Sequence, residues 1–213
     1  MDPTLSARVD AAAALLRRGG IVAYPTETFY GLGALARDAD AVRRLAHAKG
    51  RPDGKPLPLV AADVAMVEEV AELGPVGAAL AARFWPGPLT LVLPARGGLP
   101  DEITGGTGTV GIRVPGSDIA RALCRAAGGP LVSTSANVSG SPPAARVEDL
   151  AAEVASRLDG VLDGGPAPGG LASTVVALDG VSVRLVRAGP VAIEEVQAAA
   201  GAVPPGALHP RGR

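Results

Sequence analysis

Apolar residues recur along the chain at two different spacings. Seven stretches place them three or four positions apart, which predicts helices at about 7–18, 40–49, 63–72, 76–84, 118–127, 148–158 and 192–200. Short β-branched runs predict strands at 21–24, 57–60, 89–93, 110–114, 131–134, 174–178 and 183–186. Because strands alternate with helices, we expect an α/β layer structure. Strands crowd around 89–114 and 174–187, so some of them should pair antiparallel within a mixed sheet.

Several predicted helices open on an acidic residue, as at Asp40, Asp63 and Asp118, which suits the unpaired amides of a first turn. The length of 213 residues favours a single domain, which we place at 1–203. Residues 204–213 show no periodicity, and we expect a flexible tail there.

The sequence shows no pattern typical of a targeting signal or a membrane span. The first residues do not combine a charged segment with an apolar one, so we expect no signal peptide. The longest apolar runs are far shorter than a bilayer span. The sequence therefore predicts a soluble, cytoplasmic protein without membrane contact.

Composition excludes several classes of protein. Hydrophobic residues make up 47% of the chain and the net charge is −1, which excludes a mainly disordered chain and argues against a polycation that coats nucleic acid. The single cysteine, Cys124, excludes a disulfide framework or a cysteine-based metal site, and we expect it in the core. With only His47 and His209 present, a serine–histidine couple or a histidine-rich metal site is not expected.

Two glycine-rich segments resemble nucleotide-binding motifs without meeting their requirements. Segment 106–111 has the letters of a dinucleotide fingerprint, but it precedes a predicted strand instead of opening a helix. Segment 50–56 is one residue short of a Walker A loop, and Pro56 stands where a hydroxyl should hold magnesium.

Lysine usage is the most unusual feature of the composition. Of the 20 basic residues, 18 are arginine, and the two lysines are Lys49 and Lys55, with Arg51 between them. Lysine binds phosphate as a compact point charge, whereas arginine favours bidentate geometry. The pattern fits a phosphate site, or equally a solvated loop after a helix, and composition leaves both open.

Polar side chains follow two of the predicted strands. Segment 24–33, Tyr-Pro-Thr-Glu-Thr-Phe-Tyr-Gly-Leu-Gly, combines hydroxyls, a carboxylate and glycines, which is typical of a ligand loop. Segment 133–140, Ser-Thr-Ser-Ala-Asn-Val-Ser-Gly, could surround a polar ligand or form a turn with its own backbone. Arg113 lies among apolar neighbours in a predicted strand and requires an anion, either a structural carboxylate or that of a substrate. We favour the substrate.

Five further motifs accompany these two segments along the sequence. They are Lys-Gly-Arg-Pro at 49–52 with Lys-Pro-Leu at 55–57, Trp-Pro-Gly-Pro-Leu-Thr at 85–90, Gly-Ile-Arg-Val-Pro at 111–115, Ser-Thr-Val-Val at 173–176 and Arg-Ala-Gly-Pro at 187–190. In this order, the seven segments resemble the YrdC-like family of threonylcarbamoyl-AMP synthases over roughly residues 10–200. The resemblance implies a single α/β domain with one twisted mixed sheet, flanked by helices and lining a basic concave cavity.

The resemblance also implies an activity. L-Threonine, bicarbonate and ATP would give threonylcarbamoyl-AMP and pyrophosphate, with Mg²⁺ bridging the phosphates and no tightly bound organic cofactor. A separate tRNA threonylcarbamoyl transferase complex would then use the product for N6-threonylcarbamoyladenosine formation. Weak direct contact with tRNA fits this expectation.

The family's functional residues match particular positions of this chain. The threonine contacts would be Thr28, Arg113, Ser133 and Ser173. The ATP contacts would be Arg51, Lys55, Thr109, Ser135, Asn137, Pro143 and Arg187, and the catalytic cations would be Lys49 and Arg51. Val60 stands where some members have a histidine that contacts threonine. Longer members carry a second C-terminal domain, for which we expect no room after Arg187.

Two other functions remain as alternatives. The first is an RNA-binding module without catalysis, against which the net charge of −1 and the scarcity of aromatic residues argue. The second is carbamoyl transfer through a carbamoyl-adenylate, as in related domains of hydrogenase-maturation proteins, which would need further domains.

Overall fold

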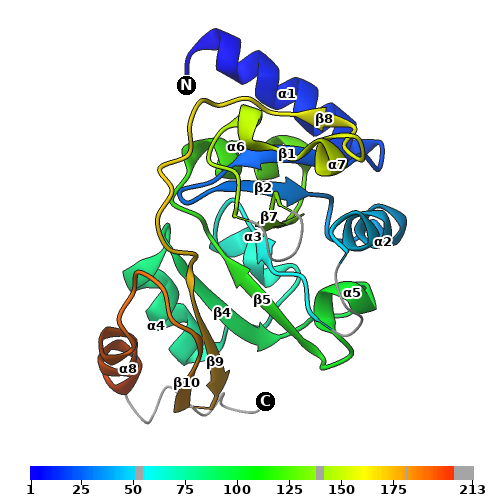
Figure 1. Cartoon of the computed structure of the whole chain (residues 1–213). Helices are drawn as coiled ribbons and strands as arrows, with labels where there is room; N and C mark the ends of the chain where they lie inside the picture. The colour runs from blue at the N-terminus through cyan, green and yellow to red at the C-terminus, as the bar shows by residue number, and fades with distance from the viewer. Residues whose placement is uncertain (51–54, 138–141, 181, 204–213) are drawn as a thin grey trace.

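The computed structural model describes residues 1–50, 55–137, 142–180 and 182–203, arranged as two β-sheets surrounded by helices (Figure 1). The helices are α1 (Pro3–Arg17), α2 (Ala39–Ala48), α3 (Val64–Glu68), α4 (Gly74–Phe84), α5 (Asp101–Thr104), α6 (Asp118–Ala127), the 3-10 helix η1 (Val147–Asp149), α7 (Ala152–Ala155) and α8 (Ile193–Gly201). The strands are β1 (Val22–Pro25), β2 (Tyr30–Gly33), β3 (Leu59–Val60), β4 (Leu89–Pro94), β5 (Thr109–Arg113), β6 (Leu131–Val132), β7 (Thr134–Ser135), β8 (Gly160–Val161), β9 (Thr174–Asp179) and β10 (Ser182–Arg187).

The α/β class and the mixed pairing are confirmed, but the prediction of one sheet is wrong. A four-stranded sheet has the order β7-β2-β1-β8, and a six-stranded sheet has the order β10-β9-β4-β5-β3-β6. Both sheets combine parallel and antiparallel pairs, and the expected antiparallel pairs are β4 with β5 and β9 with β10.

The chain crosses from one sheet to the other inside the predicted strand 131–134. β6 pairs with β3 of the large sheet, whereas β7 pairs with β2 of the small one. Ser133 lies between them, and its backbone amide donates to the carbonyl of Pro58 at 2.8 Å. The predicted strand 131–134 therefore contributes one short strand to each sheet, and the local sequence pattern did not predict this division.

Three helices begin at a side chain that caps the first turn, within two residues of the predicted start. The Asp38, Asp63 and Ser117 side chains accept from backbone amides of the first turns, while Asp40 and Asp118 lie within those turns. The predicted helix 148–158 is wrong, because only η1 and the single turn α7 form there. The Asp149 carboxylate instead accepts from the preceding backbone amides of residues 145 and 146, a local alternative to helical bonding.

Strand β2 was missed because its glycines weaken a strand pattern. β2 nevertheless pairs with β1 along its whole length. A Cβ atom at Gly33 would lie only 2.6 Å from the Tyr24 ring, so the close approach of the two strands requires glycine there.

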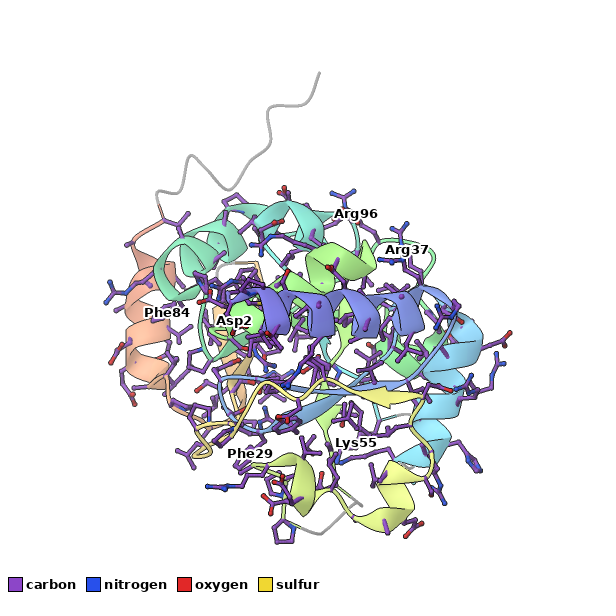
Figure 2. All side chains as sticks on the ribbon, turned by 90° about the horizontal axis from the view of Figure 1, so that it is seen from above. Asp2, Phe29, Arg37, Lys55, Phe84 and Arg96 are labelled. Atoms are coloured by element: carbon purple, nitrogen blue, oxygen red, sulfur yellow. The ribbon has the colours of Figure 1, made fainter. Side chains whose placement is uncertain are left out.

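Two hydrophobic clusters hold the domain together. The larger joins both sheets with α2 and α4, and α8 packs beside α4 (Figure 1). The smaller lies where α1 contacts α6, and α1 crosses the molecule with Asp2 at its start (Figure 2). Cys124 is fully buried there, as expected, and burial raises its pKa to about 12. No helix in the described part of the chain is long and apolar enough to span a bilayer.

Candidate active site

A cavity of about 480 Å³ is lined by residues of both sheets. From the large sheet come Thr90 and Val92 of β4 together with Thr109, Gly111 and Arg113 of β5. Alternate residues of a strand face the same side, so each strand presents one face to the cavity. From the small sheet come residues of β2, β7 and the loop after β1. The volume lies in the range of small-molecule sites.

Most of the predicted site residues meet in this cavity. Those that line it are Thr28, Lys49, Lys55, Thr109, Arg113, Ser133, Ser135, Asn137, Ser173 and Arg187. Pro143 is half-buried and is not among the described lining residues, and Arg51 lies outside the residues that the structure describes. Val60 is fully buried in the smaller hydrophobic cluster. Phe29 and Lys55, which both line the cavity, lie on the same side of α1 in Figure 2.

Lys49 is a buried cation at the end of α2. Its Nζ donates to the backbone oxygens of Ser135 and Asn137 at 2.6 and 2.7 Å, and it lies 3.1 Å from Ser135 Oγ and 2.5 Å from Asn137 Oδ1. Lys49 thus ties the end of α2 to the segment that follows β7. The solvated-loop alternative is wrong for this lysine, whereas Lys55 is exposed.

Arg113 is a second buried cation and has a carboxylate partner. Its Nε donates to Glu27 Oε1 at 3.0 Å, and both side chains are largely buried. The structural carboxylate that the sequence left open is therefore present. Arg113 also lines the cavity, and neither of its Nη nitrogens donates to any residue that the structure describes. Its assignment to a substrate carboxylate stays a prediction.

Arg187 and Ser173 form the third polar group. The Arg187 guanidinium donates to the Ser173 carbonyl at 2.8 and 3.1 Å and to Ser173 Oγ at 3.1 Å. Ser173 Oγ also lies 2.9 Å from Thr90 Oγ1. Burial, and secondarily the charge of Arg113, lower the pKa of Arg187.

The charged side chains among the described lining residues are all cationic. Lys49, Lys55, Arg113 and Arg187 line it, and no acidic residue is among the described lining residues. In the described part of the chain, no group of three or more histidine, cysteine or acidic side chains could hold a metal. The lining is suited to an anionic ligand surrounded by hydroxyl groups.

Thr26 and Thr90 line the cavity as well, although the sequence analysis assigned neither of them a role in binding. Thr90 was the single hydroxyl in an apolar strand, and strand alternation could have indicated it. Thr26 Oγ1 accepts from the amides of Thr28 and Phe29 and donates to the Phe29 carbonyl at 2.7 Å, which shapes the loop after β1.

The sequence is similar to a known family and to several known proteins. The profile of the Sua5, YciO and YrdC family, described as telomere recombination, matches residues 14–189. The chain belongs to this family. A Sua5/YciO/YrdC relative from Bacillus subtilis (strain 168), named threonylcarbamoyl-AMP synthase, is 42% identical over 194 residues, which are 90% of this chain and 56% of the relative. This chain thus spans little more than half of that protein.

One further member of the Sua5/YciO/YrdC family matches this chain over nearly its own full length, and another has a solved structure. A protein of the same name from Xanthomonas campestris pv. campestris (strain B100) is 40% identical over 84% of this chain and 96% of its own length. The crystal structure of Pyrococcus abyssi Sua5 complexed with L-threonine superposes with a TM-score of 0.86 at 40% identity, covering 93% of this chain and 58% of the Sua5 chain.

Proposed function

We propose that this protein synthesises threonylcarbamoyl-AMP from L-threonine, bicarbonate and ATP, with release of pyrophosphate. The observation that carries the proposal is the cavity itself, where four cations, several hydroxyls and no described acid meet. The similarity to proteins named threonylcarbamoyl-AMP synthase, and to a Sua5 structure with L-threonine, supports this substrate set.

The chemistry requires positive charge and alignment more than proton transfer. The threonine amine and bicarbonate form a carbamate with loss of water, and a carbamate oxygen then attacks the α-phosphorus of ATP. The bond to the β-phosphate bridging oxygen breaks, and pyrophosphate leaves with its electrons. Charge on the phosphate oxygens is best stabilised by cations fixed in advance. The cations of the cavity are suited to this role.

The threonine end of the cavity is assigned to Thr28, Arg113, Ser133 and Ser173. The Nη groups of Arg113 offer a planar fork for the substrate carboxylate, and the hydroxyls offer donors and acceptors to the threonine hydroxyl. Ser133 and Ser173 are buried, so their contacts with a bound amino acid would be shielded from water.

The triphosphate end is assigned to Lys49 and Lys55 with Arg187, together with Arg51, which lies outside the described residues. Thr109, Ser135, Asn137 and Pro143 are assigned to the remaining contacts with ATP. Mg²⁺ would be bound mainly by the phosphates, because the described lining offers no carboxylate ligand. A downstream tRNA threonylcarbamoyl transferase complex would consume the product, and direct contact with tRNA would be weak.

The test is a reconstituted reaction of purified protein with ATP, bicarbonate and isotopically labelled threonine. We expect pyrophosphate release to require both threonine and bicarbonate, and the product to have the mass of threonylcarbamoyl-AMP. Reactions lacking one component at a time serve as controls. Pyrophosphate release without threonine, or ATP consumption without an adenylate product, would overturn the proposal.

A further inference from the structure

Glu27 is a buried carboxylate behind the wall of the cavity. Its side chain is only 16% exposed, and it lies in the loop between β1 and β2. Oε1 accepts from Arg113 Nε at 3.0 Å, while Oε2 is buried without a hydrogen-bond partner in the described structure. A buried carboxylate is costly unless it is paired, so this placement needs a reason.

Glu27 lies next to the cavity without lining it. Glu27 is absent from the described lining of the cavity, although its neighbours Thr26 and Thr28 belong to it. Glu27 also packs against Gly116, where a Cβ atom would lie 3.5 Å from that of Glu27. The carboxylate contacts the guanidinium through Nε, and Arg113 lines the cavity while neither Nη nitrogen donates to a residue that the structure describes.

We infer that Glu27 is a positioning residue, which fixes the Arg113 guanidinium so that both Nη nitrogens face the anionic group of the amino-acid substrate. The inference rests on the proposed function for the identity of that group. Glu27 supplies the countercharge that keeps Arg113 buried without occupying the fork. A fork held in advance loses less entropy on binding than a freely rotating side chain.

Three variants distinguish a positioning role of Glu27 from a general disruption of the folded structure. Glu27→Ala removes the acceptor and should weaken L-threonine binding about 10- to 100-fold, the size expected from displacement of a binding group by about 1 Å. Glu27→Gln keeps an oxygen facing Nε and should recover a substantial part of that loss. Glu27→Ala in an Arg113→Ala background should cost no further threonine affinity, because Glu27 acts through Arg113.

The measurement is calorimetric titration of each variant with L-threonine and, separately, with ATP. ATP affinity in the absence of threonine should stay within about 3-fold of wild type in every Glu27 variant. Glu153→Gln is the matched control, because Glu153 pairs with Arg157 at 3.1 Å on the surface and lies outside the cavity lining. It should leave both affinities unchanged.

Unchanged threonine binding by Glu27→Ala and Glu27→Gln would overturn the inference. Stronger threonine binding by these variants would also overturn it and would indicate that Glu27 competes with the substrate. A parallel loss of ATP affinity would overturn it as well. The Nε–H NMR signal of Arg113, assigned by its disappearance in Arg113→Lys, tests the inference without any ligand. It should exchange slowly in wild type and rapidly in Glu27→Ala. Failure of wild type to bind threonine, with this signal intact, would overturn the proposed function alone.

Discussion

Replacement of Lys49 by methionine should lower both stability and ATP binding. Methionine keeps the length of the side chain and removes the ammonium that contacts oxygens of Ser135 and Asn137. An ammonium has only three protons for these four oxygens, so at most three strong hydrogen bonds are lost. Each charged hydrogen bond contributes roughly 1.5–3 kcal/mol, but the variant no longer buries a charge.

The lost hydrogen bonds lower the free energy of unfolding, and the removal of a buried charge raises it. Together they should lower the free energy of unfolding by about 2–4 kcal/mol. For a protein of this size, about 1 kcal/mol shifts the melting temperature by about 2–4 °C, so Lys49→Met should melt roughly 4–16 °C below wild type. Lys55→Met is the matched control, because Lys55 lines the same cavity but is exposed. It should change the free energy of unfolding by less than about 0.5 kcal/mol.

The assay combines calorimetric unfolding with ATP titration of the folded variants. Both variants should bind ATP more weakly, by about 10-fold or more if one charged contact to phosphate is lost. Only Lys49→Met should also be destabilised. Equal melting temperatures for Lys49→Met and wild type would refute the reasoning that this lysine ties α2 to the segment after β7.

Other predictions concern substrate choice, RNA and pH. Pyrophosphate release with L-serine should be about 10- to 200-fold less efficient than with L-threonine, since one methyl group distinguishes them; equal turnover of alanine would contradict the assigned pocket. Arg113→Ala should weaken threonine binding about 10- to 150-fold and leave ATP binding nearly unchanged, as titration with each ligand would measure. RNA affinity should disappear as salt rises, and tight tRNA binding at physiological salt without adenylate chemistry would favour a binding module. Burial raises the pKa of Cys124 from about 9 to about 12, so the free energy of unfolding should fall as pH rises from about 9 to about 12, and should fall less steeply in Cys124→Ala.

The sequence by itself determined the class of the fold and indicated part of the lining of the cavity. Apolar spacing located most helices and strands, because burial on one face follows the period of each local structure. The two lysines and the polar segments at 24–33 and 133–140 indicated about half of the residues that line the cavity. These signals are local, and they depend only on neighbouring residues along the chain.

Only the tertiary structure decided how those segments meet. The split of one apolar run at Ser133 depends on its bond to Pro58, far away in the sequence. The partnership of Arg113 with Glu27 joins positions 86 residues apart, and Lys49 contacts Ser135 across the same separation. Long-range pairing between strands fixes such contacts, and no periodicity of a single segment encodes them. Local pattern therefore supplied the candidate groups, and the packing of two sheets selected their partners.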